Sequence, residues 1–60
     1  MIKQLLMMNG TVYEATENQF FELYHTGKTY VLWEVDGEFT RKVKSFRRSN
    51  VVSVNRIADR

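Results

Sequence analysis

The sequence predicts a small α+β domain, in which a strongly bent antiparallel sheet of order ββαβββ, close to a partly open barrel, carries one short helix. Three observations support this fold. Asn-Gly and Asp-Gly dipeptides mark two hairpin turns, runs of β-branched and aromatic residues flank them, and a capping-box pattern stands between them. The 60 residues contain no proline, repeat or low-complexity stretch, so we expect one domain over residues 1–60.

The first two strands are expected at about residues 2–8 and 11–15. Asn9-Gly10 stands between them, and Asn-Gly is the dipeptide that most readily supplies the two positive φ angles of a type I′ turn. The residues before the dipeptide are mainly apolar, and those after it include β-branched and aromatic types. The sequence therefore predicts a tight hairpin at the start of the chain.

A short helix is expected next, at about residues 17–26. Thr16–Gln19 matches a capping box, in which the threonine oxygen accepts from the N3 amide and the glutamine side chain reaches back. Apolar residues follow at helical spacing up to Tyr24, and Gly27 suits a helix end. The alternative is a strand from Phe20 to His25 that turns at Gly27, because aromatic residues favour strands. We prefer the helix.

Residues 28–35 and 38–46 are expected to form a second hairpin around Asp36-Gly37. A two-residue loop would mix apolar and charged residues on both faces, whereas a three-residue loop of residues 36–38 separates them. The pairs that follow from the longer loop are Val35 with Phe39, Trp33 with Arg41, and Val31 with Val43. Lys42 and Lys44 then share the opposite face, and Arg41 is placed for a cation–π contact with Trp33.

The chain is expected to end in a polar turn at residues 47–50 and a last strand from Val51 to Ile57. Such a sheet has open edges, and open edges invite pairing with other strands.

Residues for catalysis or metal binding are scarce. The chain has no cysteine, and its one histidine, His25, has no aspartate or glutamate three or four residues further on. No phosphate loop, nucleophile elbow or zinc-protease motif occurs. We therefore expect a protein that is not an enzyme, with no catalytic residue, no metal, no cofactor and no small-molecule substrate.

The apolar run after Lys3 is too short for a secretory signal or a membrane span. Together with the absence of cysteine, this favours a cytoplasmic location and no membrane partner.

The basic run from Arg41 to Arg48 is the most distinctive feature. Residues 1–38 carry two basic and six acidic side chains, whereas residues 39–60 carry seven basic and one acidic. Cations that contact phosphates beside rings that stack on bases are typical of sheet-based nucleic-acid surfaces. The alternative is a solvated strand whose lysines protect a sheet edge. The candidate partner-binding residues are Tyr30, Trp33, Arg41, Lys42, Lys44, Phe46, Arg47 and Arg48.

The sequence also holds more large apolar side chains than a thin core can bury. A 60-residue domain buries only about 60% of the surface that its unfolded chain exposes. Adjacent pairs such as Leu5-Leu6 and Phe20-Phe21 place bulk on both faces of one element. We therefore expect part of the surplus to form an interface, and the chain to self-associate through its first strand or its helix.

These features favour a small non-enzymatic binding protein that docks on another protein and modulates it, as an inhibitor or accessory factor. Its size, short loops and lack of catalytic groups are similar to those of small phage and mobile-element proteins. The alternative function is a nucleic-acid-binding module that uses the basic strand and turn at residues 41–48.

Overall fold

The protein folds as one small antiparallel sheet with almost no helix. The computed structural model describes residues 1–56, and its elements are β1 (Ile2–Met7), β2 (Val12–Glu14), β3 (Gln19–Leu23), β4 (Thr29–Asp36), β5 (Phe39–Arg47), a single 3-10 turn η1 (Arg48–Asn50) and β6 (Val51–Arg56). The strand order is β2-β1-β3-β4-β5, and β6 pairs with β1. The predicted antiparallel sheet is confirmed.

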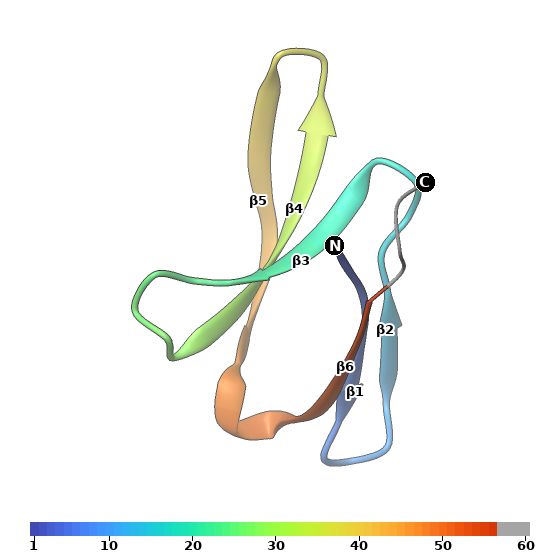
Figure 1. Ribbon diagram of the computed structural model, residues 1–60, viewed down its shortest axis with the longest axis vertical. Coiled ribbons are helices and arrows are strands. Elements are labelled where there is room, and N and C mark those ends of the chain that lie inside the picture. The colour runs from blue at the N-terminus through green and yellow to red at the C-terminus, as the bar shows by residue number, and fades with distance from the viewer. Residues whose placement is uncertain (57–60) are drawn as a thin grey trace.

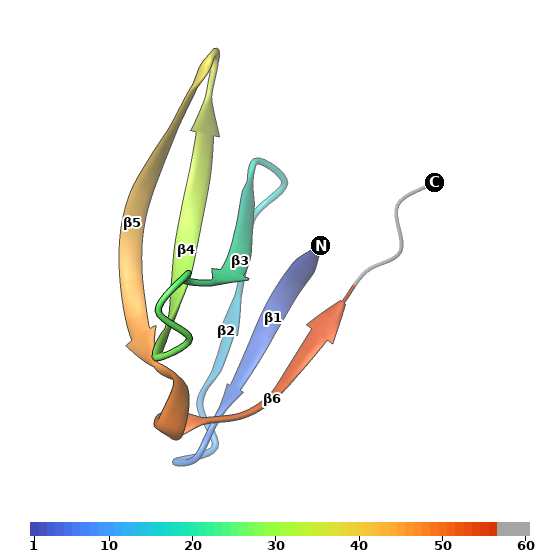
Figure 2. The same cartoon turned by 60° about the vertical axis from the view of Figure 1, so that its left-hand side comes forward.

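The sheet is bent into two groups of strands. β3, β4 and β5 form a meander, which Figure 1 shows extending into the long β4–β5 hairpin, while β2 and β6 flank β1. Only the Ile2–Phe21 pair joins β1 to β3, and Figure 2 shows β1 and β6 fanning away from the meander. Within residues 1–56, β5 pairs only with β4 and β6 only with β1, so the sheet does not close.

The first hairpin forms where it was predicted, but its turn differs. The N–H of Met7 donates to the Thr11 carbonyl at 2.8 Å, and the N–H of Gly10 donates to the Met7 carbonyl at 2.9 Å. Gly10 has a φ of 88°, whereas no described residue other than glycine has a positive φ. The type I′ prediction is therefore wrong, because Asn9 keeps a negative φ and instead accepts the Thr11 N–H through its side chain.

The predicted helix at residues 17–26 is wrong, and the alternative strand is correct. Residues 19–23 form β3, which pairs with β4 from Gln19–Glu34 to Leu23–Tyr30. The chain then turns at Gly27, whose φ is 75°. A strand sends Phe21 into the core, where it is 2% exposed, and supplies β4 with a partner along five residue pairs. Tertiary pairing therefore outweighs the local helical pattern.

The capping-box residues form a turn instead of starting a helix. The Gln19 side chain accepts from the Thr16 N–H at 3.0 Å, as a capping box requires, and the Gln19 N–H donates to the Thr16 carbonyl. Lys3 secures this turn from β1, because its ammonium donates to the carbonyls of Thr16, Glu17 and Gln19. One of the two reciprocal hydrogen bonds of a capping box thus forms without a helix, while the Thr16 hydroxyl donates to Asn18 instead of accepting from the Gln19 N–H.

The β4–β5 register also differs from the prediction. The loop holds two residues, Gly37 and Glu38, between the paired Asp36 and Phe39, and a positive φ at Gly37 alone fits a type II′ turn. The register then shifts between Leu32 and Trp33, which leaves Val43 as the extra residue of a β-bulge. Neither register considered from the sequence contained a bulge.

The end of the chain follows the prediction in outline. The expected turn at residues 47–50 is η1, with Arg47 still the last residue of β5, and β6 follows at residues 51–56. The predicted extension of this strand to Ile57 lies outside the described residues.

The core is small and entirely apolar among the described residues. Its main cluster consists of Ile2, Leu5, Phe21 and Phe46, with Tyr13 half-buried against it, and Val31 is buried apart from this cluster. The Tyr13 and Phe46 ring centroids lie 4.8 Å apart, so β2 and β5 meet across the inner face of the bent sheet.

Candidate functional site

The basic run of β5 is divided between the two faces of the meander. Opposed residues on antiparallel strands share a face, and the inner face is the one that carries Phe21 and Phe46. Arg41 and Lys44 lie on this inner face, opposite Glu34 and Leu32. Lys42 and Arg47 lie on the outer face, opposite Trp33 and Thr29.

Two sequence predictions are wrong, the first because of the bulge and the second because of the two-residue loop at Gly37 and Glu38. Lys42 and Lys44 do not share a face, because the extra residue at Val43 moves Lys44 to the face of Arg41. The expected cation–π contact between Trp33 and Arg41 is absent from the described contacts, since Lys42 lies opposite Trp33.

Arg41 instead forms an ion pair with Glu34. An Arg41 guanidinium nitrogen lies 2.8 Å from Oε2 of Glu34, and the Gln19 amide donates to Oε1 at 3.0 Å. The hydrogen bond from Arg41, and then that from Gln19, hold the pKa of Glu34 below its ordinary value of 4.5. The same hydrogen bond raises the pKa of Arg41. Arg41 is therefore engaged within the chain.

Three other predicted site residues serve the inner face. Phe46 is buried in the core, and Tyr30 is half-buried opposite it. The Lys44 ammonium lies 5.2 Å from the ring centroid of Tyr13 and 5.4 Å from that of Phe46. These positions support packing more directly than they support contact with a partner.

Of the other four predicted residues, Trp33, Lys42 and Arg47 lie on the outer side of the meander, and Arg48 lies in η1 at the end of β5. Arg47 and Arg48 line a groove of about 680 Å³ together with Lys28, Thr29 and Ser49. The Arg48 N–H donates to the Lys28 carbonyl at 3.0 Å and its guanidinium to the Gly27 carbonyl at 3.2 Å, which fixes η1 against the β3–β4 loop. We call Lys28, Trp33, Lys42, Arg47 and Arg48 the basic face.

Sequence reasoning missed Lys28 as part of this face. It lies thirteen residues before the basic run begins, and only the pairing of β4 with β5 brings it beside Arg47 and Arg48. Phe20 was also assigned elsewhere, to the predicted helix, but as a strand residue it lies opposite Trp33.

A second surface lies on the outer side of β1, β2 and β6. Leu6 pairs with Val12 on one side and with Ser53 on the other, so the three share a face. A register shift between Leu6 and Met7 leaves Val52 as a bulge beside them. We call Leu6, Met8, Val12 and Val52 the apolar face, and they are 37%, 71%, 49% and 60% exposed.

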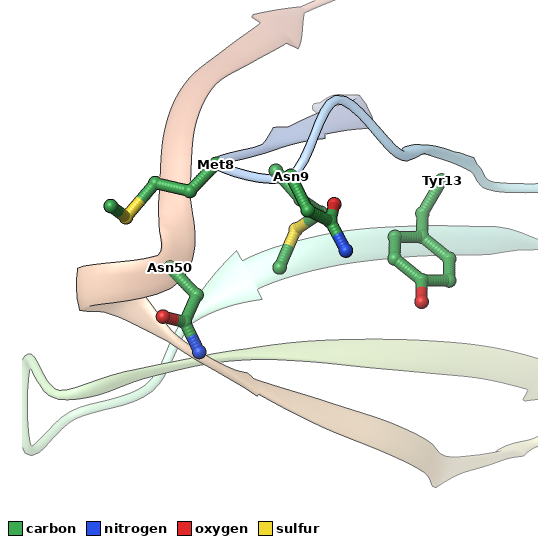
Figure 3. A pocket seen from close by; sticks show the side chains of 5 residues that line it. Met8, Asn9, Tyr13 and Asn50 are labelled. Carbon is green, nitrogen blue, oxygen red and sulfur yellow. The ribbon is translucent and has the colours of Figure 1, made fainter.

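Polar residues border the apolar face. Gln4 donates to the Glu14 carboxylate at 3.2 Å and accepts from the Asn55 amide at 3.3 Å, which makes a polar row across β2, β1 and β6. Beside the β1–β2 turn, Figure 3 shows Met8, Asn9, Tyr13 and Asn50 around a pocket of about 250 Å³, on the inner side of the sheet that carries Tyr13. An apolar centre with a polar border is typical of protein-binding surfaces.

Among residues 1–56, no three histidine, cysteine, aspartate or glutamate side chains gather as a metal site. His25 is exposed, and its ring centroid lies 4.2 Å from that of Tyr24. The same part of the chain holds no helix of the length and apolar character needed to cross a membrane.

Comparison with known proteins adds no identification. No family model, no curated protein and no solved structure matches the chain.

Proposed function

We propose that this chain is a small non-enzymatic binding protein whose apolar face docks on an uncharged apolar surface of another protein. The single observation that carries the proposal is the uncharged row of Val12, Leu6 and Ser53, extended by the exposed Met8 and Val52. Inhibitor and accessory factor are the two roles that such docking serves.

The chemistry of the row selects the partner. No member of it carries a charge, and the nearest charged side chain in the adjacent row, Glu14, already accepts from Gln4. Placing the row against a charged surface would remove the partner's charge from water without supplying an opposite charge, which costs free energy. An apolar partner surface has no such cost and gains the burial of exposed valine, leucine and methionine. Methionine at position 8 also adapts to surfaces of different shape.

The size of the core supports the same proposal. Only five side chains among the described residues are buried apolar groups, namely Ile2, Leu5, Phe21, Val31 and Phe46, whereas ten large apolar residues are exposed. Covering the apolar face adds buried area that the chain does not obtain by folding alone.

The test compares two double variants that carry identical changes. V12K/V52K places two lysines on the apolar face, while V35K/V43K places two lysines at similarly exposed positions, 40% and 46%, on the β4–β5 hairpin. Each tagged protein is incubated with a nuclease-treated extract of the source organism. The retained proteins are then purified, and the affinity of each for the parent and for both variants is measured by titration. The proposal is supported by a partner that binds the parent and V35K/V43K but binds V12K/V52K with an affinity at least tenfold lower.

Equal loss in both variants, or no protein retained by the parent, would contradict the proposal. Sedimentation of the purified chain tests whether a second copy of the chain binds the apolar face instead. A dimer that V12K/V52K dissociates, with no other protein retained, would assign the face to self-association and overturn docking on a different protein.

A further inference from the structure

The outer side of the meander carries cations that the described part of the chain leaves without a carboxylate partner. Within residues 1–56 the one ion pair joins Arg41 to Glu34, on the inner face. Lys28, Arg47 and Arg48 line one concave surface, and its volume of about 680 Å³ lies within the range of ligand pockets, about 300–1,000 Å³. Three positive charges on one groove attract an anion.

Aromatic side chains lie on the same face of the sheet as Arg47. Phe20, Trp33 and Lys42 form one cross-strand row over β3, β4 and β5, because Trp33 is opposite Phe20 on one side and Lys42 on the other. Arg47 shares this face at the far end of β5. A ligand lying along β5 therefore passes Lys42 and the indole ring of Trp33 in the middle of the strand, and Arg47 at its end.

The row of residues between those of Trp33 and Arg47 contains a buried side chain. Val31 lies between Glu22 and Ser45 in this row, is 1% exposed, and is not a member of the inner core cluster. The carboxylate of Glu22 stands at the β3 side of this row, so it favours a path for an anion along β5 rather than along β3.

We infer that the basic face binds single-stranded nucleic acid, with phosphates on Lys28, Arg47 and Arg48 and on Lys42, and a base stacked on Trp33. Phosphates and bases alternate along a single strand, and the face offers both cations and a ring. An acidic peptide would use only the cations, and a duplex keeps its bases stacked inside and away from an indole on a sheet. This inference uses a surface separate from the apolar face and is independent of the proposed function.

Fluorescence anisotropy with a labelled oligothymidylate of about 12 nucleotides tests the inference, since single-strand sites span about 4–16 nucleotides. K42Q/R47Q removes two cations from the basic face, and R41Q/K44Q removes two cations of the same strand from the inner face. The loss of two single-strand phosphate contacts flattens the slope of log affinity against log salt by about 1.4, which is about 25-fold weaker binding near 0.1 M salt. We expect this change in K42Q/R47Q and less than a threefold change in R41Q/K44Q.

Trp33 supplies an independent readout, because it is the only tryptophan in the chain. Stacking of a base is expected to quench its fluorescence with the same midpoint as the anisotropy change. A polyglutamate peptide and a duplex of equal length serve as the other ligands. Three results would each overturn the inference. The first is equal weakening of binding in both double variants, and the second is tighter binding of polyglutamate or duplex without quenching. The third is no binding of the oligonucleotide near 0.05 M salt.

Discussion

Replacement of Lys3 by methionine tests how the chain between β2 and β3 is held. The Lys3 ammonium donates to three carbonyls, those of Thr16 and Glu17, which are exposed, and that of Gln19, which is partly buried. Water replaces the lysine at the two exposed carbonyls, so only the partly buried one is expected to lose a hydrogen bond in full. A hydrogen bond to a charged donor contributes about 1.5–3 kcal/mol, and we expect this decrease in the free energy of unfolding.

Urea denaturation followed by circular dichroism measures the change. A domain of 60 residues has a free energy of unfolding of about 3–9 kcal/mol, so the loss is a large fraction of the total and lowers the melting temperature by roughly 6–24 °C. Lys42→Met is the control, since Lys42 is exposed and has no side-chain hydrogen bond within residues 1–56, and it is expected to stay within about 0.5 kcal/mol of the parent. If both variants unfold at the same urea concentration, the three carbonyls do not depend on Lys3.

Two further predictions concern the core and the ion pair. Phe46→Ala is expected to cost about 3–5 kcal/mol and to leave the chain largely unfolded by circular dichroism, whereas Phe39→Ala, at a 77% exposed position, stays within about 0.5 kcal/mol; equal losses would contradict the location of the core. Arg41→Gln removes the main cause of the low pKa of Glu34, which is expected to rise towards 4.5 while the Gln19 hydrogen bond keeps it somewhat lower, as carbon NMR titration will show. A carboxyl whose pKa is lowered by folding stabilises the fold at pH values above its unfolded pKa, and this contribution is lost as the pH falls through the folded pKa. The parent should therefore lose more stability than Arg41→Gln on acidification below about pH 4.5. An unchanged titration of Glu34 in Arg41→Gln would argue against the ion pair.

The strands could be predicted from the sequence because their signals are local. Glycine after asparagine or aspartate marked both hairpins, and β-branched and aromatic runs marked β4 and β6. The turn types could not be predicted in the same way. A type I′ turn and the observed turn both accept Asn9-Gly10, and in the observed turn the side chain of Asn9 accepts a hydrogen bond from the Thr11 N–H.

The error at β3 came from a motif that serves two structures. The Gln19 side chain reaches back to Thr16 in a capping box and also in the turn that precedes β3. What separates the two outcomes is distant in the sequence, namely Lys3 on the turn and β4 beside residues 19–23. Only the alternative interpretation, with its weight on aromatic residues in strands, led to the correct element.

The predicted site residues are divided between the two faces, and the bulge is what separates Lys44 from Lys42. Strict alternation along β5 would have kept Lys42 and Lys44 together, as the sequence prediction had it. Nothing in the sequence around Val43 indicates an extra residue, because the bulge depends on how β5 follows the twist of β4. Lys28 could have been found only by knowing which residues stand opposite Arg47 in the hairpin.

The bulge at Val43 also determines where this chain tolerates a change of length. Lys42 and Lys44 pair with Trp33 and Leu32, which are neighbours on β4, so the ladder is already continuous across the gap that a deletion of Val43 would leave. Deletion of Val43 keeps all the remaining residue pairs of the hairpin. Deletion of Ser45 would instead turn the side chains on one side of the deleted position to the wrong face of the sheet. Insertions and deletions are ordinarily confined to loops. In β5 a site that accepts a one-residue deletion lies in mid-strand, so a related chain that lacks this residue would present the same two faces.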